Sequence, residues 1–376
     1  MSNCKLIVVS AVNLRKGGTL TILNDCLSAL SEMAERNQVR VVALVHDRRL
    51  ADYPSIEFIE LPWAKRSWAH RLWCEYMTMH GISHRLGDID LWLSLHDTTP
   101  RVKARRQAVY CHNSYPFFHW HWHHVWLNYR IVCFALFTKL YYLINLKRNS
   151  FVVVQSQWFR KAFAKMTGFG ANKTIVFPPS TSFSSPSHSD TQVSPLPHPT
   201  PFTFLYPAYP DVHKNMECLC EASRLLEQEV GVNRFQVLLT TSPTANRYSR
   251  WLHRRWGNVK SLRFCGFMSK ERLNKIYCDT DCLVFPSQVE TWGLPISEFA
   301  VTGRPMLLAD RPYAHETAAG SRCTAFFDAD DPVTLKTLMH DVIKRKTDTF
   351  QHIGQKDIEP PFVRNWEQLI SQLLQQ

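Results

Sequence analysis

The length, composition and charge of the chain exclude several classes of protein. With 376 residues, 45% of them hydrophobic and 20% charged, it is typical of a globular protein but too long for one ordinary core, so we expect two domains. No stretch reaches the roughly 20 uncharged apolar residues of a membrane span, and the first residues lack the layout of a signal peptide. The eleven cysteines are odd in number and show no zinc-site spacing, which indicates reduced thiols and a cytoplasmic protein.

The net charge of +12 comes from about one quarter of the chain. No Asp or Glu lies between Asp97 and Asp190, and residues 98–189 carry twelve Lys and Arg residues, which leaves 32 basic and 32 acidic residues in the remainder. Positive charge concentrated in one segment indicates the kind of partner that the protein binds, and it says nothing about the fold. Nucleic acid, an anionic membrane surface and phosphorylated substrates are all compatible with it, but the sequence has no recognised nucleic-acid-binding motif, so we expect no nucleic acid.

The first part of the chain alternates strand-like and helical stretches. A buried strand is expected at 5–10, then a loop with Gly17 and Gly18, then a helix over 19–35. The further strands expected in this part are 39–45, 57–61, 91–95, 108–111 and 151–155. Such alternation predicts a parallel sheet with helices on both faces, and we place this first α/β domain at residues 1–177.

Two features of residues 119–146 leave alternatives open. Four histidines, at positions 119, 121, 123 and 124, invite a metal site, but no neighbouring carboxylate or paired cysteine supports one, so we expect none. Residues 131–146 are mostly apolar, with Lys139 as the one charge, and are too few to span a bilayer. They predict either a buried core helix or a helix at a membrane surface, with Trp120, Trp122 and Trp126 at headgroup depth.

The composition changes at residues 178–201, which are rich in Ser and Pro and predict a linker. The alternation then restarts, with strands expected at 202–206, 236–240, 261–265, 282–285, 305–308 and 324–327, and helices at 215–229, 270–278, 296–302, 333–346 and 363–374. We therefore expect a second doubly wound α/β domain over 202–360 and a carboxyl-terminal helix over 361–376 that can pack back on the first domain. Open sheets of this kind bind ligands at the carboxyl ends of their strands, so two facing sheets predict a ligand cleft.

Two glutamates, Glu290 and Glu298, follow the expected strand 282–285 and flank Trp-Gly-Leu-Pro. Pro295 suits a first helical turn, which places Glu298 inside a helix and Glu290 on the loop before it. Carboxylates accept hydrogen bonds from paired hydroxyls, and sugars and riboses present such pairs. The pair therefore predicts a site for a sugar or a ribose.

Other loop residues could contact an anion or a sugar. Gly17 and Gly18 would let backbone N–H groups approach a phosphate, although a simple tight turn is also compatible with them. His112 follows the strand 108–111 and is either a structural residue or directed into the cleft. Lys214 lies at an expected helix start, where a bound anion would relieve its repulsion from the helix dipole.

Residues 285–305, Phe-Pro-Ser-Gln-Val-Glu-Thr-Trp-Gly-Leu-Pro-Ile-Ser-Glu-Phe-Ala-Val-Thr-Gly-Arg-Pro, resemble the E-x7-E motif of retaining nucleotide-sugar-dependent glycosyltransferases of the GT-B fold, family four. The Gly17-Gly18 pair resembles the glycine loop of that family. The stretches 91–97 and 110–113 resemble its bacterial cell-surface polysaccharide branch, and 265–267 resembles the turn before its site. The resemblance covers most of the chain and implies two Rossmann-like domains facing each other across a cleft.

The resemblance also implies roles for single residues. Glu290, Lys214 and His112 would be catalytic: Glu290 would hold hydroxyls of the donor sugar, Lys214 would neutralise the departing diphosphate, and His112 would lie beside the transferred sugar. Three further donor contacts are implied. Glu298 would bind the ribose, and the loop backbone at Gly17 and Gly18 would approach the donor phosphate. The backbone of Gly293, Leu294 and Pro295 would line the phosphate and nucleoside pocket.

Many relatives carry an arginine five or six residues before the lysine, where this chain has Tyr209 and Ala208. Arg15, Lys16 or His213 could complete the diphosphate clamp in its place. The resemblance implies no cofactor and activity without an added divalent ion.

The implied reaction transfers a hexose such as mannose, rhamnose or fucose, with retention, to a growing cell-surface polysaccharide of the O-antigen or capsule type. The acceptor would be a glycan linked to a lipid diphosphate, and the protein would be cytoplasmic, at the inner face of the cytoplasmic membrane. Two alternatives stay open. One is an enzyme of the same fold that does not transfer to a glycan, namely a phosphorylase, a nucleotide-sugar hydrolase or an epimerase; the other is a non-catalytic basic binding module.

Overall fold

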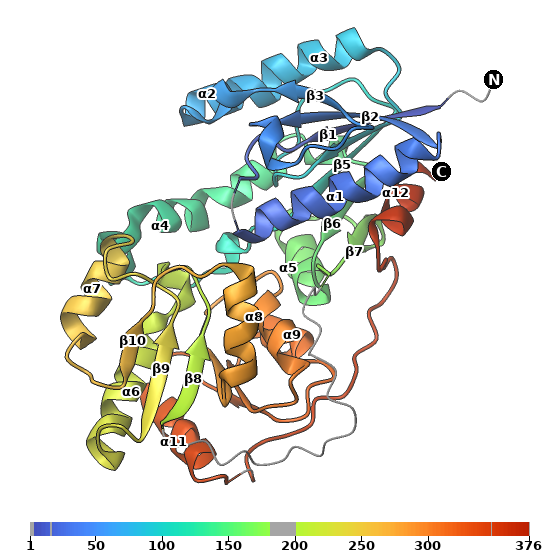
Figure 1. Ribbon diagram of the computed structural model, residues 1–376. Coiled ribbons are helices and arrows are strands. Elements are labelled where there is room, and N and C mark those ends of the chain that lie inside the picture. The colour runs from blue at the N-terminus through green and yellow to red at the C-terminus, as the bar shows by residue number, and fades with distance from the viewer. Residues whose placement is uncertain (1–3, 16, 181–200, 347, 376) are drawn as a thin grey trace. The chain divides into compact units, whose positions relative to one another are not determined.

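A computed structural model describes residues 4–15, 17–180, 201–346 and 348–375 of the chain (Figure 1). The chain divides into two compact units. The amino-terminal unit comprises Met1–Asn113, Phe137–Ser180 and Ile358–Gln376, and the carboxyl-terminal unit comprises Ser114–Leu136 and Thr181–Asp357. Ser114–Leu136 thus belongs to the carboxyl-terminal unit, whereas the sequence analysis placed it in the first domain. Most of the expected linker, residues 181–200, lies outside the described residues.

Among the described residues, seven parallel strands form the sheet of the amino-terminal unit, in the order β3-β2-β1-β4-β5-β6-β7. The strands are β1 (Lys5–Ser10), β2 (Val39–Val45), β3 (Glu57–Glu60), β4 (Leu91–Ser94), β5 (Arg106–Cys111), β6 (Phe151–Val154) and β7 (Thr174–Val176). The central strands are apolar on both faces because helices cover both sides of a parallel sheet. The sequence analysis missed β7, which is too short for a readable pattern.

The helices and helical turns of this unit are α1 (Gly17–Glu35), η1 (Arg48–Leu50), η2 (Pro62–Lys65), α2 (Trp68–Trp73), η3 (Cys74–Thr78), α3 (Met79–Leu86), η5 (Leu146–Arg148), α5 (Gln157–Thr167), η6 (Ala171–Lys173) and α12 (Trp366–Leu374). Helix α12 lies beside α1 (Figure 1) and buries Leu369, Ile370 and Leu373 in the same core cluster. The ring of Trp366 stacks on that of Tyr110 of β5, with centroids 6.0 Å apart. The last residues of the chain therefore complete the core of the amino-terminal unit.

Helix α4 (Trp122–Leu143) begins in the carboxyl-terminal unit and ends in the amino-terminal unit. Its backbone is non-helical at Asn128, with φ −156° and ψ 79°. The side-chain amide of Asn128 donates to Oδ1 of Asp211 at 3.0 Å. This contact ties the kink to a loop of the carboxyl-terminal unit.

In the described part of the carboxyl-terminal unit, six parallel strands follow the order β10-β9-β8-β11-β12-β13. The strands are β8 (Phe202–Tyr206), β9 (Phe235–Leu239), β10 (Leu262–Phe264), β11 (Cys282–Phe285), β12 (Met306–Ala309) and β13 (Thr324–Phe327). The helices and turns are η4 (Tyr115–Phe117), η7 (Val212–Lys214), α6 (Met216–Val230), α7 (Arg247–Trp256), α8 (Lys270–Asp279), α9 (Leu294–Ala300), α10 (Pro312–Thr317) and α11 (Pro332–Ile343).

Both sheets have the doubly wound order, in which the chain starts near the middle and winds outward in both directions. The expected fold class, two doubly wound α/β domains, is confirmed. The switch point lies between β1 and β4 in one sheet and between β8 and β11 in the other. All candidate site residues except Glu298 lie in loops or first turns that follow β1, β5, β8 or β11.

Two further observations bear on the expectations from composition. All eleven cysteines lie in described residues, and each is a free thiol. Among the described helices, none combines the length and the apolar character that crossing a membrane requires.

Candidate functional site

Lys214 and Glu290 come together because their strands are neighbours. β8 and β11 pair in parallel, so the loops that follow them leave the same edge of the sheet side by side. The hydroxyl of Tyr206 on β8 donates to the carbonyl of Lys214 and lies 2.8 Å from Oγ of Ser287 in the second loop. The ammonium of Lys214 forms an ion pair with the carboxylate of Glu290, and both side chains are mostly buried.

Lys214 ends the short turn η7, two residues before α6, close to the helix start expected for it. Asn215 follows in the left-handed region, at φ 52°, and its side-chain amide donates to the carbonyls of Pro286 and Ala329 at 3.1 and 2.7 Å. These hydrogen bonds fix the loop that carries the lysine against the loop that carries Glu290. The ammonium is therefore positioned by buried backbone contacts as well as by its own ion pair.

The turn into α9 requires a glycine for two reasons. Gly293 has φ +97°, a conformation that disfavours residues with a Cβ. An added Cβ would also lie 3.2 Å from the side chain of Ile296 and 3.6 Å from that of Tyr313. Leu294 and Pro295 then open the helix. The expectation that Glu298 lies within a helix and Glu290 on the preceding loop is confirmed.

Glu298 is buried on α9, and its Oε2 accepts a hydrogen bond from the hydroxyl of Tyr277 at 3.0 Å. Burial raises the pKa of Glu298, and the hydrogen bond from Tyr277 and the positive charge of Lys270 offset this only in part. The sequence analysis missed both partners. They lie seven residues apart on α8, a spacing that places them on one face of that helix, but nothing local shows that this face meets α9.

In the amino-terminal unit, His112 is held by a carboxylate on the neighbouring strand end. β4 and β5 pair in parallel, and they end near Asp97 and His112. Oδ1 of Asp97 accepts the backbone N–H groups of His112 and Asn113 at 2.7 and 3.1 Å, and its Oδ2 lies 3.2 Å from Nε2 of His112. The hydroxyl of Tyr142 donates to the carbonyl of Asn113 at 2.8 Å. Asp97 was not recognised as a site residue, although it ends the stretch 91–97 that carries part of the resemblance.

The carboxylate of Asp97 favours one tautomer of His112. A carboxylate oxygen only accepts, so its position beside Nε2 favours a proton on that nitrogen and leaves Nδ1 of the neutral ring as the acceptor. This Nδ1 is buried and has no hydrogen-bond partner among the described residues. This nitrogen is therefore able to accept a hydrogen bond from another molecule.

Gly17 opens α1 in the left-handed region, with φ +60°, and an added Cβ at Gly17 or Gly18 would meet nothing within 4 Å. The backbone in this turn is therefore open on the side where a side chain would stand. These two glycines and His112 belong to the amino-terminal unit, whereas Lys214, Glu290, Gly293 and Glu298 belong to the carboxyl-terminal unit.

His213 is one of the residues suggested to replace the arginine absent at positions 208 and 209. This histidine is buried, and burial together with the nearby charge of Lys214 holds its pKa well below its ordinary value. The lowered pKa favours the neutral ring and therefore disfavours His213 as that cation. Arg15 is half-buried in the amino-terminal unit, and Lys16 lies outside the described residues.

Asp211, another residue that the sequence analysis missed, lies in the loop that leads to Lys214. Burial raises its pKa to about 6, although the charge of Lys214 and the hydrogen bond from Asn128 act in the opposite direction. A carboxyl group that titrates near neutrality beside the lysine can change the local charge within the working pH range of an enzyme.

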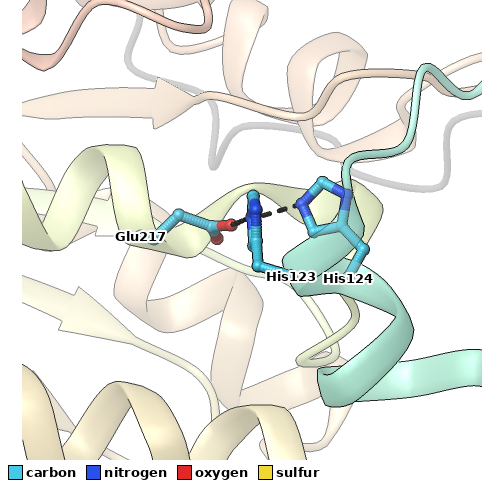
Figure 2. Close-up of side chains that lie close together, drawn as sticks. All are labelled: His123, His124 and Glu217. Carbon is cyan, nitrogen blue, oxygen red and sulfur yellow. Dashed lines mark ion pairs between the residues drawn. The ribbon is translucent and has the colours of Figure 1, made fainter.

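His123 and His124 at the start of α4 face Glu217 in the first turn of α6 (Figure 2). Their Nε2 atoms lie 3.9 and 3.8 Å from Oε1 of Glu217, and the hydroxyl of Tyr248 donates to its Oε2. The sequence analysis found no carboxylate near these histidines because Glu217 is distant in the chain. Burial favours a higher pKa for Glu217, but the hydrogen bonds of the two histidines and Tyr248 outweigh it, so its pKa lies below the ordinary value.

The three side chains are close enough to suggest a metal site, but the ring orientation of His124 favours a different function. The backbone N–H of His121 donates to Nδ1 of His124 at 2.9 Å. With Nδ1 as acceptor, the proton of the neutral His124 ring is on Nε2, which faces the carboxylate, so His124 directs no lone pair at a cation there. We therefore interpret the cluster as a hydrogen-bonded tie that fastens the start of α4 to α6.

Comparison with known proteins bears on the fold and on the class of enzyme. Residues 202–345 match the family model described as glycosyl transferases group 1. No curated protein matches the chain. The fold is similar to those of sucrose-phosphate synthase from Thermosynechococcus elongatus (TM-score 0.65, 14% identity, 92% of each chain covered) and of Anabaena HepE in complex with UDP (TM-score 0.63, 15% identity, 92% of each chain).

It is also similar to WaaG, a glycosyltransferase involved in lipopolysaccharide biosynthesis, with a TM-score of 0.60, 13% identity and 90% of each chain covered. At such identities the likeness establishes the fold, which is GT-B, and the match of residues 202–345 supplies the class. Residues 202–345 thus form a domain of the glycosyl transferases group 1 family, and the assignment of this GT-B-fold chain to the glycosyltransferases is confirmed.

Proposed function

We propose that this protein transfers a hexose from a nucleotide sugar to a growing cell-surface polysaccharide, with retention at the anomeric carbon. The proposal rests mainly on the ion pair between Lys214 and Glu290, which lies at the switch point of the carboxyl-terminal sheet. Glu298 is buried on the helix that follows. We assign donor binding to this domain, residues 202–360.

Each acidic residue has a distinct task in this proposal. Glu290 accepts hydrogen bonds from hydroxyls of the donor sugar, and Glu298 accepts them from the ribose. The backbone of Gly293, Leu294 and Pro295 lines the nucleotide pocket. Lys270, whose charge acts on Glu298, adds a second cation on the nucleotide side of the site.

The chemical step requires stabilisation of the departing diphosphate while positive charge develops on the sugar ring. The ammonium of Lys214 supplies a fixed positive charge for the phosphate oxygens. Because Lys214 is paired with Glu290, an arriving diphosphate competes for the ammonium and leaves the carboxylate of Glu290 available to the sugar hydroxyls. The proposal of a metal-free reaction rests on this cation.

The residues of the amino-terminal unit position the sugar and the acceptor. Asp97 holds the ring of His112, whose Nδ1 is the nitrogen left to accept a hydrogen bond from a sugar hydroxyl. The open backbone at Gly17 and Gly18 allows a close approach of donor phosphate and acceptor. Holding an acceptor hydroxyl beside the anomeric carbon supplies the positional part of catalysis.

The identities of donor and acceptor rest on less direct support. HepE, which shares the fold, was crystallised with UDP and with UDP-glucose, and this supports a nucleotide-sugar donor. The likeness to WaaG supports a polysaccharide product. We propose mannose, rhamnose or fucose as the hexose and a glycan on a lipid diphosphate as the acceptor. The enzyme would then act as a cytoplasmic protein at the inner face of the cytoplasmic membrane.

Donor turnover tests the proposal. Purified protein is incubated with GDP-, UDP- and dTDP-sugars, with and without a lipid-linked acceptor, in the presence of a chelator, and the anomeric configuration of the product is determined by NMR. We expect transfer with retention and without added metal. Strict dependence on manganese would refute the metal-free mechanism, and release of free sugar or sugar phosphate irrespective of acceptor would favour a hydrolase or phosphorylase.

Variants of the two glutamates test the site itself. Glu290→Gln keeps the shape but loses the acceptor charge, and we expect kcat to fall about 100-fold, as for removal of one transition-state contact. Glu298→Gln should mainly raise the donor KM. The matched control is Glu367→Gln, an exposed carboxylate on α12, which should leave both constants unchanged. Wild-type rates with unchanged donor affinity in both site variants would refute the proposal.

A further inference from the structure

The second half of α4, which belongs to the amino-terminal unit, exposes an apolar face. Phe137, Leu140, Leu143 and Ile144 are exposed, Leu140 to 57%, and their spacing places them on one side of the helix. The opposite side, with Thr138 and Tyr142, is buried. A surface helix of a globular protein ordinarily turns charged residues to solvent, but over 131–146 Lys139 is the one charged residue. Of the two earlier alternatives, a buried core helix disagrees with this exposure, and a helix at a membrane surface is compatible with it.

A second apolar surface lies on α2 and η3 of the same unit, a region for which the sequence analysis expected no element. Trp68 and Leu72 are exposed one turn apart, as are Trp73 and Met77, with Trp73 at 62%. The ring of Trp68 packs against that of Tyr141 of α4, with centroids 5.6 Å apart. The two stretches are therefore neighbours and together form what we call the apolar face: Trp68, Leu72, Trp73, Met77, Phe137, Leu140, Leu143 and Ile144.

The segments that carry this face are basic. Within residues 61–87 the single acidic residue is Glu75, which is fully buried and paired with Arg71 at 2.8 Å, and residues 98–180 contain none. Exposed basic residues of these segments within the amino-terminal unit include Lys65, Arg66, Arg85, Lys139 and Lys147. A second copy of the chain docked by the same face would bring like charges together, so charge disfavours self-association there.

We propose that the apolar face docks the amino-terminal unit on an anionic phospholipid bilayer, a proposal that deepens the proposed function by placing the enzyme where a lipid-linked acceptor lies. The aromatic rings would sit at headgroup depth, the aliphatic side chains would enter the acyl boundary, and the basic residues would contact anionic headgroups. No described helix is suited to crossing the membrane, so the association is peripheral.

Vesicle flotation of the full-length protein tests the proposal. The vesicles contain either 30% phosphatidylglycerol in phosphatidylcholine or phosphatidylcholine alone, at low and at moderate salt. We expect the wild type to float with the anionic vesicles, less at moderate salt, and weakly with the neutral ones. The double variant Trp73→Ser/Leu140→Ser should lose at least about tenfold in partition coefficient, because two exposed side chains no longer bury apolar surface in the lipid.

The matched control is Val232→Ser/Val333→Ser, which removes two exposed apolar side chains of the carboxyl-terminal unit and should float like the wild type. Circular dichroism confirms that both double variants fold. Absence of flotation, or equal flotation of the wild type and the Trp73/Leu140 variant, overturns the proposal. A wild-type dimer in light scattering that this variant dissociates, without flotation, also overturns it and assigns the face to self-association.

The failure of docking and the failure of the proposed function give different results. Flotation requires no nucleotide sugar, and donor turnover with a soluble acceptor requires no vesicle. If the Trp73/Leu140 variant no longer floats but turns over the donor normally with a soluble acceptor, docking is supported. Flotation without any turnover in the wild type leaves docking supported and contradicts the proposed reaction.

Discussion

Glu298 shows how the surroundings of one residue determine what it can bind. Burial raises its pKa, and the hydrogen bond from Tyr277 is one of two influences that lower it again. A carboxylate accepts hydrogen bonds from both ribose hydroxyls, whereas a protonated carboxyl loses part of that capacity. In the proposed role of Glu298 as the ribose acceptor, nucleotide binding should therefore weaken as the pH falls through its raised pKa.

We expect Tyr277→Phe to move this loss of affinity to higher pH, because the variant lacks a hydrogen bond that favours the charged form. The measurement is the Kd of the donor nucleotide by calorimetry between pH 5 and pH 8. Glu298→Gln serves as control, since an amide does not titrate and this part of the pH dependence should vanish. An unchanged midpoint in Tyr277→Phe would show that the hydroxyl does not control the carboxyl group.

At the scale of the elements, the tie of His123, His124 and Tyr248 to Glu217 fastens α4 to α6. The pKa of Glu217 lies below its unfolded value, so the carboxylate stabilises the fold above the unfolded pKa, and this contribution is lost as the pH falls through the folded pKa. Glu217→Gln should be less stable by about 1–3 kcal/mol at pH 7, since buried partners lose a charged acceptor.

The stability of wild type and Glu217→Gln should therefore converge on acidification below the ordinary pKa of a glutamate. Thermal unfolding followed by circular dichroism at pH 7 and at pH 3.5 measures the convergence. Glu271→Gln, an exposed carboxylate on α8, should show no such difference at either pH. A constant gap between wild type and Glu217→Gln at both values would mean that the carboxylate charge contributes nothing to the tie.

At the scale of the whole molecule, each unit has its own sheet and its own core. Leu369 of α12 is fully buried in the amino-terminal unit, and Leu335 of α11 is fully buried in the carboxyl-terminal unit. Replacing either by alanine should cost about 2–5 kcal/mol, which corresponds to a fall in Tm of about 2–4 °C per kcal/mol for domains of this size. Calorimetry should show Leu369→Ala shifting one unfolding transition and Leu335→Ala shifting another. A single unfolding transition whose Tm falls equally in both variants would show that the two units unfold as one.

Much of the fold and part of the site could be predicted because their signals are local. Apolar runs of four to seven residues between helical stretches located β1, β2 and β8, and the alternation predicted two doubly wound sheets. A proline in the first turn and the spacing of Glu290 and Glu298 placed one on a loop and the other on a helix. These features depend on backbone preferences within a few neighbouring residues.

The tertiary structure alone decided which distant residues meet and how much water reaches them. The order of the strands brings Asp97 to His112 and the loop of Lys214 to that of Glu290, and packing brings Glu217 to the histidines of α4. The raised pKa of Glu298 is likewise a consequence of burial, which no local pattern encodes. The sequence by itself thus determined most of the strands and the class of chemistry, because these follow from residue types and short-range spacing. Pairing partners, charge states and the exposed apolar face depended on contacts between segments far apart in the chain, which form only when the whole core assembles.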